Sequence, residues 1–373
     1  MKLALRELRR RPGRFVTATV ILTLIASLLM LLGGLLDGLD SGGTSAVLGQ
    51  PGDVIVYSAG SEESFLRSRV DAELRRAVEA VDGVDAVGGL GVAQLGARVP
   101  GAGPRDLADV VVFGHELAPE GVPGPGELAP GEGWADESLR DDDVREGMTL
   151  ELGPERTPVE VAGFVDGLEY SGQGTLWVEP GTWREVLNAN RPGSGLSEGT
   201  FHALLVRAAD GVDPAEVAER IDDATDGATS SLTLDDAAAA IPGVEQQRSV
   251  FNQIIGVTVG VAIVVVALFF ALLTVERTAM YGVLKALGAR SGTLFGGVLL
   301  QAVVVTLVAA LLGTVIAVVL ELAIPPGAIP YEISTGRVLG SVAALLVAAV
   351  LGCAFSLRRV LRIDPASAIG GSA

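Results

Sequence analysis

Four long apolar segments, none of which contains a charged residue, constrain this sequence more than any other feature. Each segment reaches the roughly 20 residues that an α-helix needs to cross a hydrocarbon core of about 30 Å. We therefore expect a membrane protein with four transmembrane α-helices, one and then three, and a large extracytoplasmic α+β domain inserted between helices 1 and 2. The predicted spans are residues 15–36, 254–275, 294–320 and 338–357.

The first segment could instead be a signal peptide that is removed by cleavage. Its 22 residues exceed the roughly 7–15 residues of a signal-peptide core, and residues 37–41 offer no small-x-small cleavage site. An uncleaved first transmembrane helix is therefore the favoured interpretation.

The distribution of charge predicts the orientation of the chain. Residues 1–14 carry five more basic than acidic side chains, whereas residues 37–249 hold 40 acidic residues and 14 arginines. Short basic segments stay in the cytoplasm, while long domains cross the membrane whatever their charge. We therefore expect both termini inside the bacterial cytoplasmic membrane and the acidic domain outside it. An acidic domain repels nucleic acid and anionic lipid headgroups, so nucleic acid is not an expected partner. Membrane lipid is an expected contact of the four spans.

These features predict a series of segments along the chain. They are an amphipathic cytoplasmic helix at 1–14, transmembrane helix 1 at 15–36, the extracytoplasmic domain at 37–249, transmembrane helix 2 at 254–275, a cytoplasmic helix at 276–293, transmembrane helices 3 and 4 at 294–320 and 338–357, and a cytoplasmic tail at 358–373.

The extracytoplasmic domain has mixed α and β character. Hydrophobic periodicity and turn residues predict two β-α-β units, with a Pro/Gly-rich stretch at 119–133 after the first unit. Short strand-like runs then predict a small all-β insertion near 134–190. The expected strands are 53–57, 84–99, 107–113, 149–152, 159–165, 175–178, 201–206 and 231–234, with helices at 70–81 and 214–224.

Residues that could carry catalysis or bind a metal are scarce. His115 and His202 have no second ligand at metal spacing, so they are expected to be surface or satisfied histidines. The two lysines, Lys2 and Lys285, lie outside any glycine-rich phosphate loop. The chain is therefore expected to be no enzyme and to hold no cofactor, catalytic residue or metal, and any ATP would be bound by another protein. The sequence assigns no substrate-binding residue.

A short patterned segment lies between the second and third spans. Met280, Val283, Leu284 and Leu287 are spaced as on one face of an amphipathic helix. Such a helix could dock on a protein partner or lie on the lipid surface.

The stretch from Glu276 to Ala289, ERTAMYGVLKALGA, resembles the signature of FtsX-like permeases, the MacB type of ABC transporter subunit. The family usually has an acidic residue and then Ile or Met where this chain has Ala279-Met280-Tyr281, a mild departure. The N-terminal LRELRRRPGRF and the closing RRVLRIDPA are also similar to the family, and the layout of spans agrees along the whole chain. The layout most resembles that of the haem-exporting HrtB-like and the DevC-like permeases.

The resemblance implies a pair of permeases that work with two copies of a cytoplasmic ABC ATPase. In this family the ATPase moves a coupling helix, and the spans carry the motion to the outside domain, which is called mechanotransmission. The substrate would be hydrophobic or amphiphilic, with haem as one candidate, and Met148, Glu169 and Tyr170 could ligate its iron or serve as surface or core residues. Gly256 and Gly260 would lie at the seam of the homodimer. The coupling-helix residues are Glu276, Arg277, Met280, Val283, Leu284, Lys285, Leu287 and Gly288.

Two other classes of protein stay open at this point. One is an FtsX-type signalling permease, which activates an outside partner such as a cell-wall hydrolase and transports nothing. That class usually has a smaller outside domain. The other is an anchored receptor without an ATPase, against which the signature at Glu276 argues.

Overall fold

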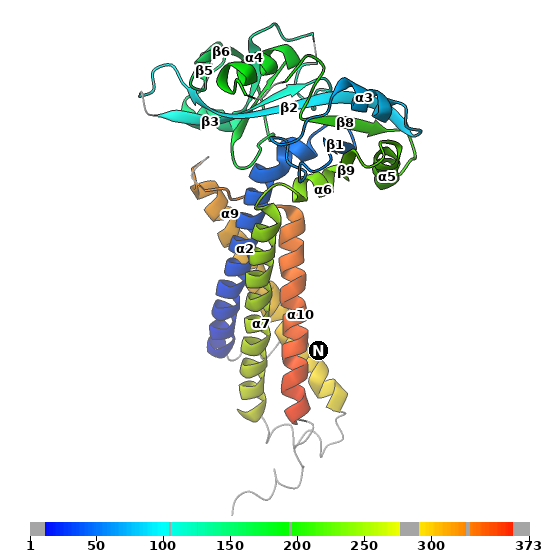
Figure 1. Ribbon diagram of the computed structural model, residues 1–373. Coiled ribbons are helices and arrows are strands. Elements are labelled where there is room, and N and C mark those ends of the chain that lie inside the picture. Colours follow the sequence, from blue (N-terminus) through cyan, green and yellow to red (C-terminus); the bar gives the residue numbers. More distant parts are fainter. Residues whose placement is uncertain are drawn as a thin grey trace, which may run out of the picture. The chain divides into compact units, whose positions relative to one another are not determined.

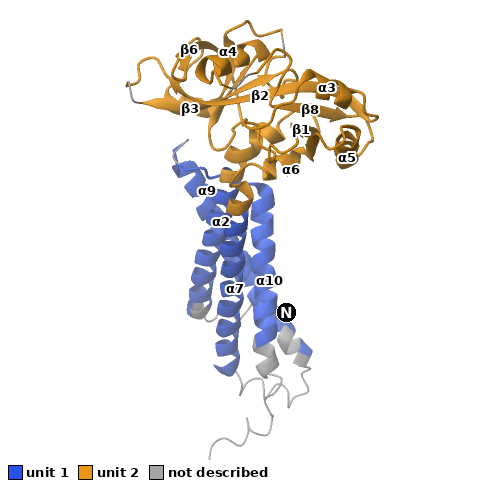
Figure 2. Ribbon diagram, viewed as in Figure 1, with its two compact units in different colours: residues 1–38, 248–373 blue, residues 39–247 orange. Residues whose placement is uncertain are grey.

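The computed structural model describes residues 12–103, 106–124, 126–193, 196–276, 291–325 and 329–360 of the 373-residue chain. The chain divides into two compact units (Figure 2). One unit comprises residues Met1–Gly38 and Arg248–Ala373, and the other comprises Leu39–Gln247.

The first unit is built from four long helices (Figure 1), each of which contains a stretch apolar and long enough to cross a membrane. The predicted fold class, one span followed by a large domain and three further spans, is confirmed. The helices are α2 (Pro12–Leu48), α7 (Val244–Glu276), α9 (Ser291–Ala323) and α10 (Thr335–Val360).

All four helices are longer than the apolar pattern predicts, and two of them extend about ten residues beyond it at one end. Helix α2 continues to Leu48 and α7 begins at Val244, so both contribute residues to each of the two units. Hydropathy marks where a helix leaves an apolar environment, whereas the helix itself can continue through polar residues.

Small residues bring the helices of the first unit close together. A Cβ built on Gly313 would lie 2.7 Å from the Ala26 side chain of α2, and a Cβ on Gly352 would lie 2.9 Å from the Ile263 carbonyl oxygen of α7. Close approach of backbones at small residues is the usual way in which transmembrane helices pack.

The second unit contains a nine-stranded sheet, which bends round on itself. Strands β2, β3, β7, β4, β6 and β5 pair in that order, and β5 pairs back to β2, so these six strands form a closed ring. The first half of β2 also pairs with β8, which continues the sheet through β1 to β9. The strands are β1 (Val54–Ser58), β2 (Val84–Arg98), β3 (Leu107–His115), β4 (Glu132–Asp136), β5 (Thr149–Leu152), β6 (Thr157–Val165), β7 (Gly174–Val178), β8 (Ala203–Ala208) and β9 (Thr229–Thr233).

Residues that alternate along a strand face two different cores, as the period of two requires. Val110 and Val112 of β3 join one hydrophobic cluster, while Val111 and Phe113 join another. The second cluster also contains Ala46 and Val47 near the end of α2, so this helix is part of the core of the second unit. The short helices of this unit are α3 (Ala72–Glu79), the 3-10 helix η1 (Glu137–Asp142), α4 (Pro180–Asn190), α5 (Pro214–Ala224) and α6 (Leu234–Ala239).

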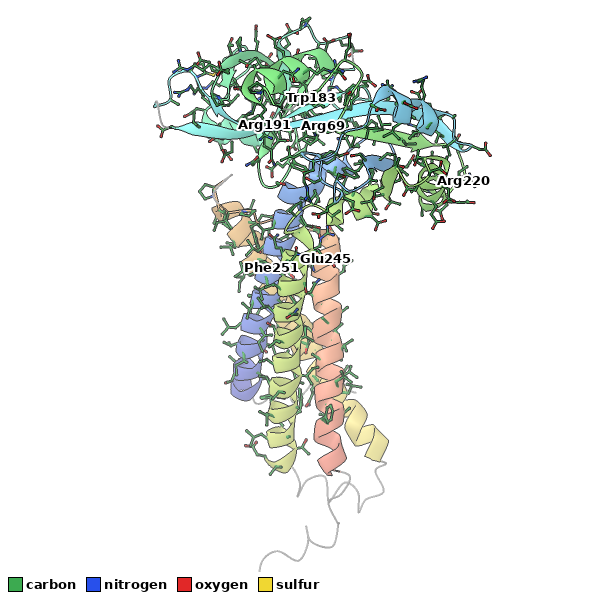
Figure 3. All side chains as sticks on the ribbon, in the orientation of Figure 1. Arg69, Trp183, Arg191, Arg220, Glu245 and Phe251 are labelled. Atoms are coloured by element: carbon green, nitrogen blue, oxygen red, sulfur yellow. The ribbon has the colours of Figure 1, made fainter. Side chains whose placement is uncertain are left out.

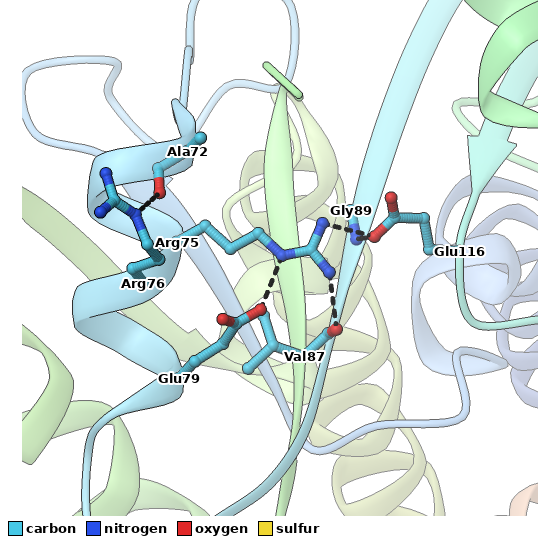
Figure 4. A network of polar contacts seen from close by, with 7 residues as sticks. All are labelled: Ala72, Arg75, Arg76, Glu79, Val87, Gly89 and Glu116. Carbon is cyan, nitrogen blue, oxygen red and sulfur yellow. Dashed lines mark hydrogen bonds and ion pairs between the residues drawn. The ribbon is translucent and has the colours of Figure 1, made fainter. Parts of the chain in front are cut away.

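Arg75 joins helix α3 to the sheet (Figure 4). Its guanidinium donates to Glu79 at 2.8 Å and to the Val87 carbonyl at 3.2 Å, and it lies 2.7 Å from the Glu116 carboxylate. Glu116 in turn accepts the Gly89 N–H at 2.8 Å. Three parts of the fold that are separate in sequence are thereby held by one side chain.

The predicted all-β insertion near 134–190 is wrong. This segment contains η1 and the 11-residue helix α4, and its strands belong to the same sheet as the flanking units. Pro180 starts α4, and Trp183, Val186 and Leu187 bury one face of it. Their spacing of three and four is helical, so the signal is present in the sequence.

Glycines on β2 and β3 make room for aromatic rings. A Cβ on Gly89 would lie 2.4 Å from the Phe201 ring, and a Cβ on Gly91 or Gly114 would lie 2.2 or 2.5 Å from Trp183. The glycine-rich run on β2 therefore serves close packing of two stacked rings, Trp183 and Phe201, whose centroids are 5.9 Å apart.

Candidate functional site

Most of the predicted coupling helix lies outside the described residues. Glu276 is the last residue of α7 and is exposed. The remaining predicted positions fall within residues 277–290, so their role stays a prediction. These positions are Arg277, Met280, Val283, Leu284, Lys285, Leu287 and Gly288.

Gly256 and Gly260 lie on a face of α7 that is open within the described part of the chain. A Cβ built on either glycine would meet no atom within 4 Å. Large apolar side chains occupy a second open strip of α7, roughly 100° round the helix from the two glycines, and Val257 and Leu268 are 68% and 65% exposed. The exposed apolar residues are spaced alternately by four and three, which is the pattern of a seam between two helices. They are Val250, Ile254, Val257, Val261, Val264 and Leu268.

A cavity of about 380 Å³ lies between α2, α7 and α10. Its wall combines apolar residues, among them Leu29, Ile255 and Val259, with polar and charged ones. A volume of a few hundred Å³ with a mixed lining is in the range of small-molecule sites, which take roughly 300–1,000 Å³. The remaining lining residues are Asp37, Ser334, Gly336, Arg337, Gly340, Ser341 and Ala344.

An ion pair lies in the lining of this cavity. The Nε and Nη2 atoms of Arg337 both donate to Oδ1 of Asp37, the first at 3.0 Å, and the Ser334 hydroxyl donates to Oδ2 of Asp37 at 2.8 Å. The side chains of Asp37 and Arg337 are only 18% and 30% exposed. Ionisable residues beside transmembrane helices are costly and often mark a functional site.

Sequence reasoning missed this pair because each residue stands one position outside a predicted span. Asp37 follows the span 15–36, and Arg337 precedes the span 338–357, so each looks like an ordinary flanking charge. Gly33 is the one feature of the sequence that points to this ion pair. A Cβ at Gly33 would lie 2.5 Å from Cδ of Arg337, so the glycine lets the arginine lie against α2.

The two histidines are buried in the second unit rather than on its surface. Nδ1 of His202 accepts the Val92 N–H at 3.0 Å, while Nε2 of His202 and Nδ1 of His115 have no hydrogen-bond partner among the described residues. Burial, with help from the charge of the nearby Arg69, lowers the pKa of His202 to about 3. The Trp183 ring packs edge-on against the His202 ring, with 5.1 Å between their centroids. Figure 3 labels Trp183 and Arg69.

The structure does not bring the candidate iron ligands into one site. Tyr170 is buried in one hydrophobic cluster and Met148 packs against the other. Glu169 lies in the loop after β6 and contacts α2. Over the residues described, no group of three or more His, Cys, Asp or Glu side chains could hold a metal ion.

Comparison with known proteins places the chain in a family. Residues 15–224, more than half of the chain, match the model of the MacB-like periplasmic core domain, and residues 252–365 match the FtsX-like permease C-terminal model. The chain therefore belongs to the MacB-like, FtsX-type family of ABC transporter permeases. It is a multi-pass membrane protein, and membership implies a separate ATPase as its partner.

Individual relatives agree with this assignment. A protein of Staphylococcus haemolyticus (strain JCSC1435), named as a candidate hemin transport system permease, HrtB, is 23% identical over 100% of this chain and 99% of its own. An uncharacterized ABC transporter permease of Mycobacterium tuberculosis (strain H37Rv) is 32% identical over 30% of this chain and 31% of its own.

Two solved structures are also similar. The periplasmic region of MacB from Actinobacillus actinomycetemcomitans covers 53% of this chain and 96% of its own at 12% identity and a TM-score of 0.35. The extracellular domain of the noncanonic ABC-type transporter YknZ covers 48% of this chain and 98% of its own at 15% identity and a TM-score of 0.32.

Proposed function

We propose that this chain is the permease subunit of an ATP-driven exporter that works by mechanotransmission. The supporting observation is the continuity of α2 and α7, each of which contributes residues both to the helical unit and to the sheet-bearing unit. An unbroken helix transmits movement along its axis better than a flexible linker does. Two copies of the permease and two of the ATPase would form the working assembly.

The substrate we propose is a hydrophobic or amphiphilic molecule, with haem as the first candidate to test. The cavity beside Asp37 and Arg337 supports this choice, because an amphiphile needs apolar and polar contacts in one site. The name of the S. haemolyticus relative supports haem. Cells that lack the permease should be more sensitive to haem than to macrolides or peptides. Equal growth of deletion and parent strains across a haem series would remove haem as the substrate.

The coupling helix connects this function to the ATPase. Leu284 and Leu287 would each bury an apolar side chain in the ATPase, a gain of about 1.5–3 kcal/mol apiece. Leu284→Asp should therefore abolish both co-purification of the ATPase and stimulation of ATP hydrolysis, while Lys285→Ala on the hydrated face should change little, since an exposed ion pair contributes about 0–1 kcal/mol. If Leu284→Asp keeps both properties, the segment is a lipid-surface helix.

The open face of α7 is the proposed contact with a second copy. In a chain whose one cysteine, Cys353, is replaced by alanine, Val257→Cys should form an intermolecular disulfide under mild oxidation. Val308→Cys on α9 is the control, since Val308 is also exposed, at 45%. Efficient cross-linking of the α9 variant alone would place the dimer seam elsewhere.

The proposed orientation puts the sheet-bearing unit outside the cell and both termini in the cytoplasm. Glu146 is exposed in that unit, so Glu146→Cys in the same background should react with an impermeant maleimide in intact cells. Labelling that requires permeabilisation would reverse the orientation.

A further inference from the structure

The loop between β6 and β7 ends in a tight turn. Tyr170 and Gln173 exchange two backbone hydrogen bonds of 3.0 Å, and the residues between them, Ser171 and Gly172, have φ values of 53° and 73°. Two consecutive left-handed residues define a type I′ turn. The N–H groups of its two central residues are not used inside the turn and need acceptors elsewhere.

Those acceptors are carbonyl groups of α2. The Ser171 N–H donates to the Gly43 oxygen at 2.9 Å, and the Gly172 N–H donates to the Gly42 oxygen at 2.8 Å. In the opposite direction, the Ala46 N–H donates to the Glu169 oxygen at 2.8 Å. In a regular α-helix the N–H of residue 46 donates to the oxygen of residue 42, so the turn supplies a partner to each member of that pair.

Ser45 adds a side-chain contact to these three main-chain bonds. Its hydroxyl accepts the Glu169 N–H at 2.9 Å and lies 3.2 Å from the Glu169 carbonyl oxygen, to which it donates. Five hydrogen bonds thus join one turn of α2 to the residues 169–172. We call these contacts the α2 clasp.

The sequence of α2 suits this contact. A Cβ on Gly42 would lie 2.6 Å from the Glu169 carboxylate, whereas a Cβ on Gly43 would meet nothing closer than 3.8 Å. Glycine weakens a helix relative to alanine. The clasp therefore lies at one of the two paired-glycine positions of α2, the other being Gly33 with Gly34, and the loop can approach the backbone there.

Electrostatic repulsion acts within the part of the fold that carries the loop. Burial raises the pKa of Glu169, and Asp136, Asp141 and Asp166 raise it further, against a hydrogen bond from Ser138 that lowers it. None of these three carboxylates belongs to α2, so the repulsion does not act across the five hydrogen bonds of the clasp.

We propose that the α2 clasp is a two-state joint, in which the turn of α2 at Gly42–Ala46 exchanges between bonding to the β6–β7 loop and regular helical bonding. While it is closed, the clasp connects movement of α2 to the six-stranded ring, in addition to the packing of Ala46 and Val47 in the core. This role rests on the proposed function, because it requires that α2 moves during the transport cycle. The exchange between bonding states does not depend on that function.

Hydrogen–deuterium exchange of the full-length protein in nanodiscs tests the joint directly. The amides of Ser171 and Gly172 should be protected while the clasp is closed and should exchange together, whereas the Ala46 amide has a partner in both states and should stay protected. Ser45→Ala removes both bonds of the hydroxyl and should raise the two loop exchange rates roughly tenfold, and Ser45→Thr should restore protection. Unchanged rates at Ser171 and Gly172 in Ser45→Ala, or equal release of Ala46, would overturn the joint.

A matched pair of glycines controls for strain. Gly172 and Gly167 both have φ of 73° and open space around them, so alanine strains each backbone equally. Gly172→Ala should speed exchange at the Glu169 amide, which donates to Ser45 in the closed clasp, while Gly167→Ala should not. Equal effects of the two variants would show general loosening of the loop and would overturn the clasp.

Reconstitution with the ATPase separates the two proposals. Ser45→Ala should keep stimulated ATP hydrolysis but lower export of haem several-fold. If the wild-type pair neither stimulates hydrolysis nor exports haem, the proposed function fails and the exchange experiment still decides the joint. If Ser45→Ala opens the clasp and exports at the wild-type rate, the role of the clasp in transmission is overturned.

Discussion

Replacing His202 with asparagine should remove a large part of the acid sensitivity of the sheet-bearing unit. The folded protein holds His202 neutral, with a pKa lowered to about 3, whereas an exposed histidine has a pKa of about 6.5. Between these values the unfolded state binds more protons than the folded state, so stability is full above about pH 6.5 and falls as the pH drops toward 3. The loss between about pH 7.5 and about pH 5 is about 2 kcal/mol from this one group.

Asparagine is suited to the comparison because its side-chain oxygen can still accept the Val92 N–H, and it stays uncharged. Loss of the ring contact with Trp183 should lower stability by a similar amount at every pH. The difference in unfolding free energy between wild type and His202→Asn should therefore shrink by about 2 kcal/mol on acidification.

Urea unfolding followed by tryptophan fluorescence measures this difference. All three tryptophans, Trp134, Trp177 and Trp183, lie in the unit Leu39–Gln247, so the signal reports that unit within the full-length protein in detergent. Other titrating groups are common to both proteins and cancel. A difference that is the same at the two pH values would show that His202 is solvated or charged in the folded state, and would refute the reasoning.

Three further substitutions test other parts of the structure. Gly91→Ala should lower the unfolding free energy in the same assay by about 1–3 kcal/mol, because the new methyl group would overlap Trp183; no loss would mean that the ring is not packed on β2. Glu169→Gln should stabilise the protein at neutral pH, and the gain should vanish as the pH falls and the wild-type carboxyl, with its raised pKa, takes up a proton. Arg337→Gln should cost about 1–3 kcal/mol by leaving the Asp37 carboxylate without its cation, seen as earlier thermal aggregation in detergent; adding Asp37→Asn should recover part of the loss, and no recovery would indicate that the two side chains act independently.

The membrane helices and the longer strands could be predicted because their patterns reflect the solvent that each residue meets. Uncharged runs predicted the four spans, a run rich in Val, Leu and Gly predicted β2 closely, and a short strand-like run predicted β5. Helix α4 was missed although Trp183, Val186 and Leu187 carry a helical pattern, because the short strands on either side drew the whole segment into an all-β interpretation.

The contacts that matter most for the candidate site join residues far apart in the sequence. Asp37 and Arg337 are 300 positions apart, and no local periodicity relates them. The α2 clasp is even harder to predict from the sequence, because three of its five hydrogen bonds join backbone groups on both sides. Only the paired glycines at Gly42 and Gly43 hinted that another segment approaches α2 closely there.

Closure of the six strands into a ring has a consequence for solubility. The outer strand of an open sheet exposes unpaired backbone groups, which invite pairing with another molecule and aggregation. Within the described sheet the ring has no such strand, and the extension ends at β9, which is five residues long and rich in threonine and serine. The weakest point is the junction of β2 and β5, which consists of two residue pairs, Ala97 with Leu152 and Arg98 with Glu151. A substitution that separated β2 from β5 would expose two unpaired strand edges at once, so variants at this junction should aggregate before they unfold.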